Sequence, residues 1–147
     1  MSATERSSRR CEVLLVEDNP ADANLLRQSL ASSPVDFHVH VVGDGDAALD
    51  YLEGPGAGGR RPDLILLDLN LPGRDGREVL AEIRSRARWE SVPILVLTSS
   101  QAPADVRTCS ERRADGFFTK PIDLAGYDHI AVAIAEFWLA RVPGEPT

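Results

Sequence analysis

Short, continuous apolar runs alternate along the chain with longer segments whose apolar residues recur at helical spacing. Three of the runs are almost purely aliphatic, at residues 13–16, 64–67 and 94–97. Runs of this kind predict strands that are covered on both faces, as in a parallel sheet. Residues 37–42 alternate apolar side chains with histidine and predict a strand at the sheet edge, and residues 116–119 predict a short fifth strand.

The segments between and after these strands predict five helices. Their expected ranges are 20–31, 46–52, 76–87, 102–113 and 123–141. The first helix has the clearest start, because Asn19 can cap it and Pro20 suits the first helical position. Alternating strands and helices predict an α/β fold with a doubly wound, five-stranded parallel sheet. Ligands of such folds bind at the carboxyl ends of the strands.

Composition indicates a single globular domain. The chain has 147 residues, of which 43% are hydrophobic and 27% are charged, as in ordinary proteins with a packed core. We expect residues 1–10 to form a polar, disordered leader and residues 142–147 to form a tail. Residues 11–141 are then expected to form the folded domain.

Charge and cysteine usage narrow the class of protein. The formal net charge is -7 at pH 7, and an acidic surface repels both nucleic acid and anionic membranes. No apolar run approaches the ~20 residues of a membrane span, and the N-terminus lacks the apolar core of a signal peptide. Cys11 and Cys109 are far apart and show no CxxC spacing, which favours reduced thiols. We therefore expect a cytoplasmic protein that binds neither nucleic acid nor membrane.

Residues with complementary chemistry follow four of the predicted strands. Glu17 and Asp18 follow the first strand, Asp68 the third, Thr98 the fourth and Lys120 the fifth. Three carboxylates in one crevice repel one another, so they need a cation or raised pKa values. Mg²⁺ can supply the cation, because it takes carboxylate oxygens together with those of a phosphate. Lys120 and Thr98 can pair with the same anion. The set is therefore suited to a phosphoryl group attached covalently to a carboxylate.

These residues lie in motifs that resemble the response-regulator receiver-domain family. The similar segments are 13–20, 63–72 followed by Asp75 and Gly76, 96–99 and 118–121. Each motif alone is weak, but all of them occur in order and at matching spacing, over roughly residues 11–141. The resemblance implies the flavodoxin-like receiver fold, with strand order 2-1-3-4-5.

The resemblance also implies a role for each residue at the strand ends. Asp68 would be the phosphoacceptor, and Glu17 and Asp18 would be the acidic pair that holds Mg²⁺ beside it. Asn70 would supply a backbone carbonyl to the metal. Lys120 would contact the phosphoryl oxygens. The donor would be a phosphohistidine on a sensor histidine kinase, and the domain would catalyse only its own phosphorylation and dephosphorylation.

Two further residues would respond to phosphorylation. Thr98 would move toward the phosphoryl group, and Phe117 matches the rotating aromatic switch of the family. The resemblance implies a cis peptide bond between Lys120 and Pro121. Two residues depart from the common pattern, since Glu17 stands where Asp is frequent and Phe117 stands where Tyr is frequent.

Three segments suggest a finer assignment within the family. Residues 68–72, 77–80 and 136–139 are similar to the small regulators that serve phytochrome-type light-sensing kinases. We expect no effector domain after residue 141, so output would pass through protein contacts. Aromatic neighbours in the last helix, Phe137 and Trp138, point about 100° apart, so one of them is expected to face outward. We expect that surface and the edge of the fifth strand to form a symmetric homodimer.

Two other functions remain open at this point. Residues 43–48 fit the G-x-G-x-x-A pattern of a dinucleotide site, with Gly43, Gly45 and Ala48 in the small-residue positions and Asp68 near the place of a ribose-binding acid. Asp44 and Asp46 would oppose a pyrophosphate there, and a turn opening a helix explains the glycines equally well. The other function is a receiver-like scaffold that works without phosphorylation. The presence of all the acids and of Lys120 favours signalling.

Overall fold

A computed structural model describes residues 10–54, 61–99 and 103–141. The strands of the sheet are β1 (Cys11–Val16), β2 (Phe37–Val42), β3 (Leu64–Asp68), β4 (Ile94–Thr98) and β5 (Gly116–Thr119). The helices are α2 (Pro20–Ala31), α3 (Gly45–Glu53), α4 (Gly76–Arg84), the short 3₁₀ helix η2 (Ala87–Trp89), α5 (Pro103–Glu111) and α6 (Leu124–Arg141). The expected leader and tail lie outside the described residues, apart from Arg10.

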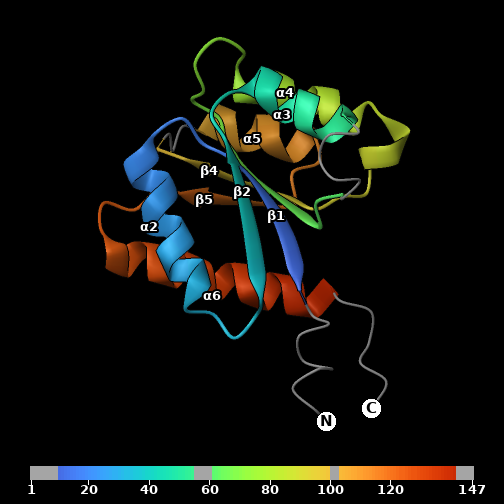
Figure 1. Cartoon of the computed structure of the whole chain (residues 1–147). Helices are drawn as coiled ribbons and strands as arrows, with labels where there is room; N and C mark the ends of the chain where they lie inside the picture. Colours follow the sequence, from blue (N-terminus) through green and yellow to red (C-terminus); the bar gives the residue numbers. More distant parts are fainter. Residues whose placement is uncertain (1–9, 55–60, 100–102, 142–147) are drawn as a thin grey trace.

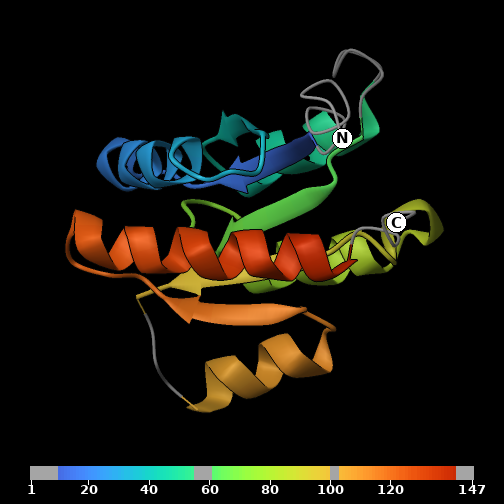
Figure 2. The ribbon, with the colours of Figure 1, turned by 90° about the horizontal axis from the view of Figure 1, so that it is seen from below.

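All pairings in the sheet are parallel, and the strand order is β2-β1-β3-β4-β5. Helices α3, α4 and α5 cover one face of the sheet, while α2 and α6 cover the other (Figure 1). Viewed from below, α6 runs across the central strands (Figure 2). The doubly wound α/β fold and the strand order expected from the sequence are therefore confirmed.

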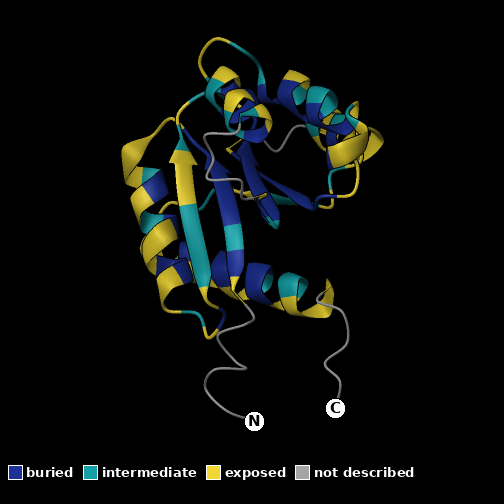
Figure 3. Ribbon diagram, turned by 45° about the vertical axis from the view of Figure 1, so that its right-hand side comes forward, coloured by how far each residue is buried: buried dark blue, intermediate teal, exposed yellow. Residues whose placement is uncertain are grey.

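Two separate cores form on the two faces, because side chains alternate along each strand. Val13 and Leu15 of β1 point into the core under α2 and α6, which also holds Tyr127. Leu14 and Val16 point into the core under α3, α4 and α5. Figure 3 shows the central strands buried and the outer faces of the helices exposed. The continuous aliphatic runs reflect this burial on both faces.

Helix α4 ends earlier than its sequence pattern predicts. The expected helix 76–87 stops at Arg84, and the chain continues into a separate 3₁₀ turn at Ala87–Trp89. The Arg84 guanidinium donates to the carbonyls of Trp89 and Val92, at 3.1 and 2.6 Å. Trp89 is buried in the core, so the chain turns toward the core after Arg84. Helical periodicity alone predicted that the helix would continue to residue 87.

The prediction that either Phe137 or Trp138 of the last helix faces outward is wrong. Phe137 and Trp138 are both partly buried and pack against the core under α2 and α6. Val132 and Leu139, at 58% and 40% exposure, are the exposed apolar residues of this part of α6. The expectation failed because the helix is apolar on several sides, so spacing alone could not identify the side that faces the sheet.

None of the helices in the described part of the chain has the length and apolar character that a membrane span requires.

Candidate functional site

The beginning of α2 shapes the first part of the site. The Asn19 side chain accepts hydrogen bonds from the backbone N–H groups of Ala21 and Asp22, at 2.9 and 3.1 Å. Pro20 occupies the first helical position, where no N–H is required. The cap turns the chain directly after β1, so Glu17 and Asp18 remain at the carboxyl end of the sheet. The backbone N–H of Asn19 donates to the Glu17 carboxylate at 3.0 Å and orients it.

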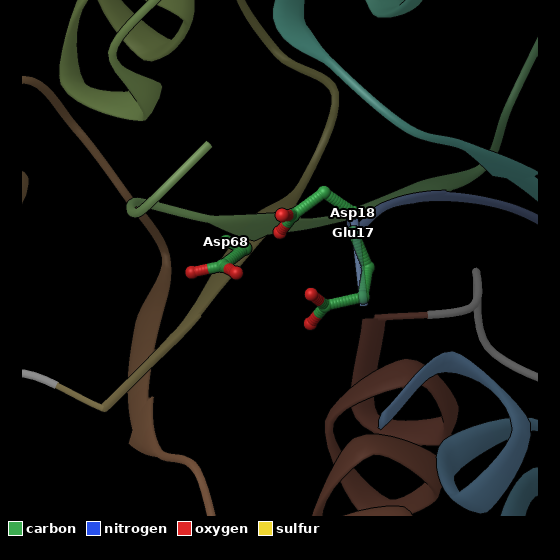
Figure 4. A group of neighbouring side chains, drawn as sticks. All are labelled: Glu17, Asp18 and Asp68. Carbon is green, nitrogen blue, oxygen red and sulfur yellow. The ribbon is translucent and has the colours of Figure 1, made fainter. Parts of the chain in front are cut away.

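Three carboxylates from two neighbouring strand ends meet at this edge. β1 and β3 pair in register up to Val16 and Leu67, so Glu17 and Asp18 lie beside Asp68. Ligand oxygens of the three acids lie within 4.8 Å of one another, and Figure 4 shows their carboxylates around a common space. Glu17 and Asp68 are buried, and Asp18 is exposed.

Lys120 contacts two of these acids from the far side of β4. Its Nζ lies 2.8 Å from Glu17 Oε1 and 2.9 Å from Asp68 Oδ2. It also lies 3.1 Å from the Asp22 carboxylate on α2, a contact that the strand-end pattern did not predict. The only signal for Asp22 in the sequence is its place in the first turn of a helix that begins next to the site.

The cis bond expected between Lys120 and Pro121 is wrong, because no peptide bond among the described residues is cis. The trans isomer is the intrinsically favoured one for an X–Pro bond. The backbone N–H of Lys120 donates to the carbonyl of Thr98 at 2.8 Å, which continues the pairing of β5 with β4. The long lysine side chain reaches the acids from this position without the cis isomer.

Burial and charge shift the pKa values of this cluster. Burial raises the pKa of Glu17 to about 7, although hydrogen bonds from Lys120 and from the Asn19 backbone oppose the shift. Burial by itself would lower the pKa of Lys120, but the bonds to Glu17 and Asp68 outweigh it and raise that pKa. The ammonium therefore stays charged, and the metal-free site already contains one cation that offsets its acids.

The loop after β3 links the acceptor strand to β4. The backbone N–H of Asn70 donates to Asp68 Oδ1 at 2.9 Å, and its side-chain amide donates to the Thr98 hydroxyl at 3.0 Å. Thr98 is fully buried at this position. Phe117 is not part of the cluster. It packs in the core under α3, α4 and α5, and lines a cavity of about 190 Å³ with residues of α5.

The G-x-G-x-x-A pattern of residues 43–48, which left a dinucleotide site open as an alternative, has a structural explanation. Asp44 caps α3 by accepting from the Ala47 N–H at 2.7 Å. A side chain at Gly45 would place its Cβ 2.5 Å from Val79 Cγ2, so glycine is needed for the packing of α3 on α4. Residues 43–48 are thus accounted for by helix start and packing.

The residues of the cluster fit a divalent metal ion. Their ligand atoms are carboxylate oxygens, which hard cations such as Mg²⁺ prefer. A cavity of about 500 Å³ borders the cluster, with Asp18, Asn70 and Arg77 in its lining. This opening leads to Asp18, the exposed member of the three acids.

Comparisons with known proteins agree with this geometry. The family model for the response regulator receiver domain matches residues 13–130. The chain is 40% identical to the response regulator Rcp1 of Synechocystis sp., over 88% of this chain and 90% of Rcp1. It is 37% identical to the probable methanogenesis regulatory protein FilR2 of Methanothrix harundinacea, over 90% of this chain and 87% of that protein.

Solved structures give the same result. The phosphorylated cyanobacterial phytochrome response regulator RcpA superposes with a TM-score of 0.83 at 42% identity, over 94% of this chain and 99% of RcpA. The Mn²⁺-bound form of Rcp1 superposes with a TM-score of 0.81 at 38% identity, over 93% and 99% of the two chains. The chain belongs to the response-regulator receiver-domain family. It is therefore a receiver domain of two-component signalling, a class of phosphoryl-accepting proteins whose partners are histidine kinases, and its acidic cluster is suited to a divalent metal.

Proposed function

We propose that Asp68 is the residue that accepts the phosphoryl group. The observation that carries this assignment is the pairing of the Asp68 carboxylate, 2% exposed, with the Lys120 ammonium at 2.9 Å inside the acidic cluster. Glu17 and Asp18 would hold Mg²⁺ together with Asp68 and the backbone carbonyl of Asn70. Bound there, Mg²⁺ would offset the charge of the phosphoryl oxygens.

The reaction follows from this arrangement. An Asp68 carboxylate oxygen bonds to the phosphorus of a phosphohistidine, the P–N bond breaks, and the imidazole nitrogen keeps the electron pair. The transition state is loose and spreads its charge over the equatorial oxygens. Lys120 offsets that charge, while the Asn70 N–H holds the other Asp68 oxygen in position. The domain would catalyse only its own phosphorylation and, with water as acceptor, its own dephosphorylation.

Thr98 and Phe117 are proposed to transmit the modification. The Thr98 hydroxyl accepts a hydrogen bond from Asn70, and a hydroxyl can also donate, in this case to a phosphoryl oxygen. A small inward shift of Thr98 would change the space beside its neighbour strand β5. Phe117 borders the cavity between β5 and α5 and has room to respond.

A labelling experiment tests the acceptor. The wild-type protein should gain the mass of one phosphoryl group from acetyl phosphate with Mg²⁺ and none in excess EDTA. Asp68→Asn should abolish the gain, whereas Asp50→Asn, an exposed acid on α3, should leave it unchanged. Full labelling of Asp68→Asn would refute the assignment.

The kinase is proposed to be of the phytochrome type. Support comes from the similarity to the cyanobacterial phytochrome response regulator RcpA and to the bacteriophytochrome response regulator AtBRR, at 42% and 35% identity. Ile122, at 99% exposure, lies two residues after Lys120 and offers an apolar contact beside the acceptor. We place the encounter in the cytoplasm, in keeping with two buried, free cysteines. Phosphotransfer profiling against purified kinases of the host tests the partner class.

Output is proposed to pass through protein contacts, including a homodimer that uses α6 and the edge of β5. Val132 and Leu139 supply the exposed apolar side chains that the partly buried Phe137 and Trp138 do not. Analytical ultracentrifugation with and without beryllofluoride should show a dimer, and Val132→Asp with Leu139→Asp should dissociate it. A monomer at high micromolar concentration under both conditions would refute the dimer.

A further inference from the structure

Asp22 is a third carboxylate partner of Lys120. Its Oδ2 accepts from the ammonium at 3.1 Å, alongside the contacts of that ammonium with Glu17 and Asp68. Asp22 lies in the first turn of α2, and its side chain is 28% exposed. An ammonium has three N–H donors, so the three carboxylates satisfy Lys120 completely.

The three partners differ in what else they can bind. Ligand oxygens of Glu17 and Asp68 lie in the cluster that fits a metal ion, together with Asp18. Asp22 is not a member of that cluster. Once Mg²⁺ engages Glu17 and a phosphoryl group is attached to Asp68, both of these carboxylates are committed to new partners. The contact between Asp22 and Lys120 is the one that does not have to change.

Lys120 needs such an anchor because of its side chain. It is the only lysine of the chain, which otherwise uses arginine for its positively charged side chains. An ammonium on a four-carbon stem can direct its charge at a single phosphoryl oxygen, but the stem is flexible and loses rotamer entropy when it is held. A carboxylate that stays in contact with Lys120 throughout the reaction keeps the ammonium oriented with little further loss of rotamer entropy.

A second group that interacts with Asp22 is Tyr127. Tyr127 of α6 is buried, and its hydroxyl makes no well-formed hydrogen bond among the described residues. Burial, followed by the negative charge of Asp22, raises the pKa of Tyr127 to about 12. The phenol therefore stays neutral and is a potential donor to Asp22.

We propose that Asp22 is a positioning residue for phosphoryl transfer, which holds the Lys120 ammonium over Asp68 while Glu17 engages the metal. The proposal rests on the assignment of Asp68 as acceptor. Asp22 touches neither the metal nor the phosphoryl group and acts only through Lys120.

The first test measures labelling by acetyl phosphate and Mg²⁺ over a range of donor concentrations. Asp22→Ala should lower the maximal rate constant about tenfold, a loss smaller than the roughly hundredfold cost of misplacing a reacting group by about 1 Å. The donor concentration giving half-maximal rate should change little, because Asp22 does not contact the donor. Asp22→Asn, which retains an acceptor oxygen, should recover part of the rate. Asp50→Ala removes the same charge from an exposed site on α3 and should behave as wild type.

The second test observes Lys120 directly. Because the chain has a single lysine, protein labelled with ¹⁵N,¹³C-lysine gives one ε-ammonium signal. With Mg²⁺ and beryllofluoride, Asp22→Ala should shift and broaden this signal through faster exchange with water, and Asp22→Asn should restore it in part. An unchanged signal together with an unchanged rate in both variants would show that Asp22 serves only the start of α2 and would overturn the proposal.

The two hypotheses fail in different ways. Labelling of Asp68→Asn would refute the acceptor assignment, whatever Asp22 does. Normal dependence on Asp68 with wild-type kinetics in both Asp22 variants would refute the positioning role alone. A faster rate in Asp22→Ala would also refute it, since Asp22 would then act chiefly by repelling the anionic donor. Thermal unfolding of each variant shows whether the fold is intact, and Asp22→Asn keeps the test valid if the alanine variant unfolds.

Discussion

The Lys120 ammonium donates to the Asp68 carboxylate at 2.9 Å, although Asp68 ends β3, Lys120 follows β5, and β4 lies between these two strands. Parallel pairing brings the carboxyl ends of β3 and β5 to the same edge of the sheet, and the length of the lysine side chain spans the strand between them. In the metal-free protein this contact compensates the charge of an acid that is almost fully buried. The same contact therefore matters for stability as well as for chemistry.

Replacing Lys120 by methionine should destabilise the metal-free protein. Removing one partner of a buried ion pair leaves its acids uncompensated, which costs about 3 kcal/mol in similar cases. Urea unfolding at pH 8, followed through the buried Trp89, measures the loss. Adding Mg²⁺ should recover part of it, because the ion binds the folded state. Arg27→Met, an exposed charge on α2, is the matched control, and equal losses in the two variants would contradict this account.

Affinity for Mg²⁺ should increase with pH across neutrality. Burial raises the pKa of Glu17 to about 7, so below that pH the metal competes with a proton on this carboxyl. Apparent affinity should fall by about tenfold per pH unit below 7 and level off above 8, as measured by calorimetric titration. Glu17→Gln should bind more weakly and with a flatter pH profile. A steep profile that survives in Glu17→Gln would assign the proton to another group.

Gly76→Ala should disturb the acceptor strand. A Cβ at Gly76 would lie 2.6 Å from Leu69 Cα and closer still to the Asp68 carbonyl oxygen, and these backbone atoms cannot move aside cheaply. We expect a loss of about 2 kcal/mol in unfolding free energy and slower labelling of Asp68. Gly43→Ala is the control, because a Cβ there would meet nothing within 4 Å. Similar behaviour of the two variants in denaturant would argue against the steric explanation.

Arg84→Met should be strongly destabilising without touching the site. The guanidinium of Arg84, a buried residue at the end of α4, donates to the carbonyls of Trp89, Val92 and Arg113 and to the Asp115 carboxylate. Methionine keeps the apolar stem but leaves those acceptors unpaired, which should cost about 3 kcal/mol or more. In urea unfolding, the control Arg107→Met, on the exposed side of α5, should change the midpoint of the transition little. Retained stability in Arg84→Met would mean that water replaces the guanidinium.

The sequence by itself determined the fold and the identity of the residues at the strand ends. Aliphatic runs at β1, β3 and β4 predict strands buried on both faces, and the structure places both faces under helices. Glu17, Asp18, Asp68 and Lys120 were expected to meet, because parallel strands end at one edge, and they do. Local pattern suffices here, since strand burial and the direction of the strands are encoded by neighbouring residues.

Only the tertiary structure decided which contacts these residues make. Asp22 contacts Lys120 because the folded chain brings the first turn of α2 beside the residue that follows β5, and helix spacing carries no information about that placement. The inward turn after Arg84 likewise depends on atoms from a distant segment, because the Arg84 guanidinium donates to the carbonyl of Arg113. In α6, apolar residues surround most of the helix, so packing on the sheet buries part of Phe137 and Trp138 and leaves Val132 exposed. Burial depends on the three-dimensional neighbours of a side chain, and the order of residues along one helix does not contain them.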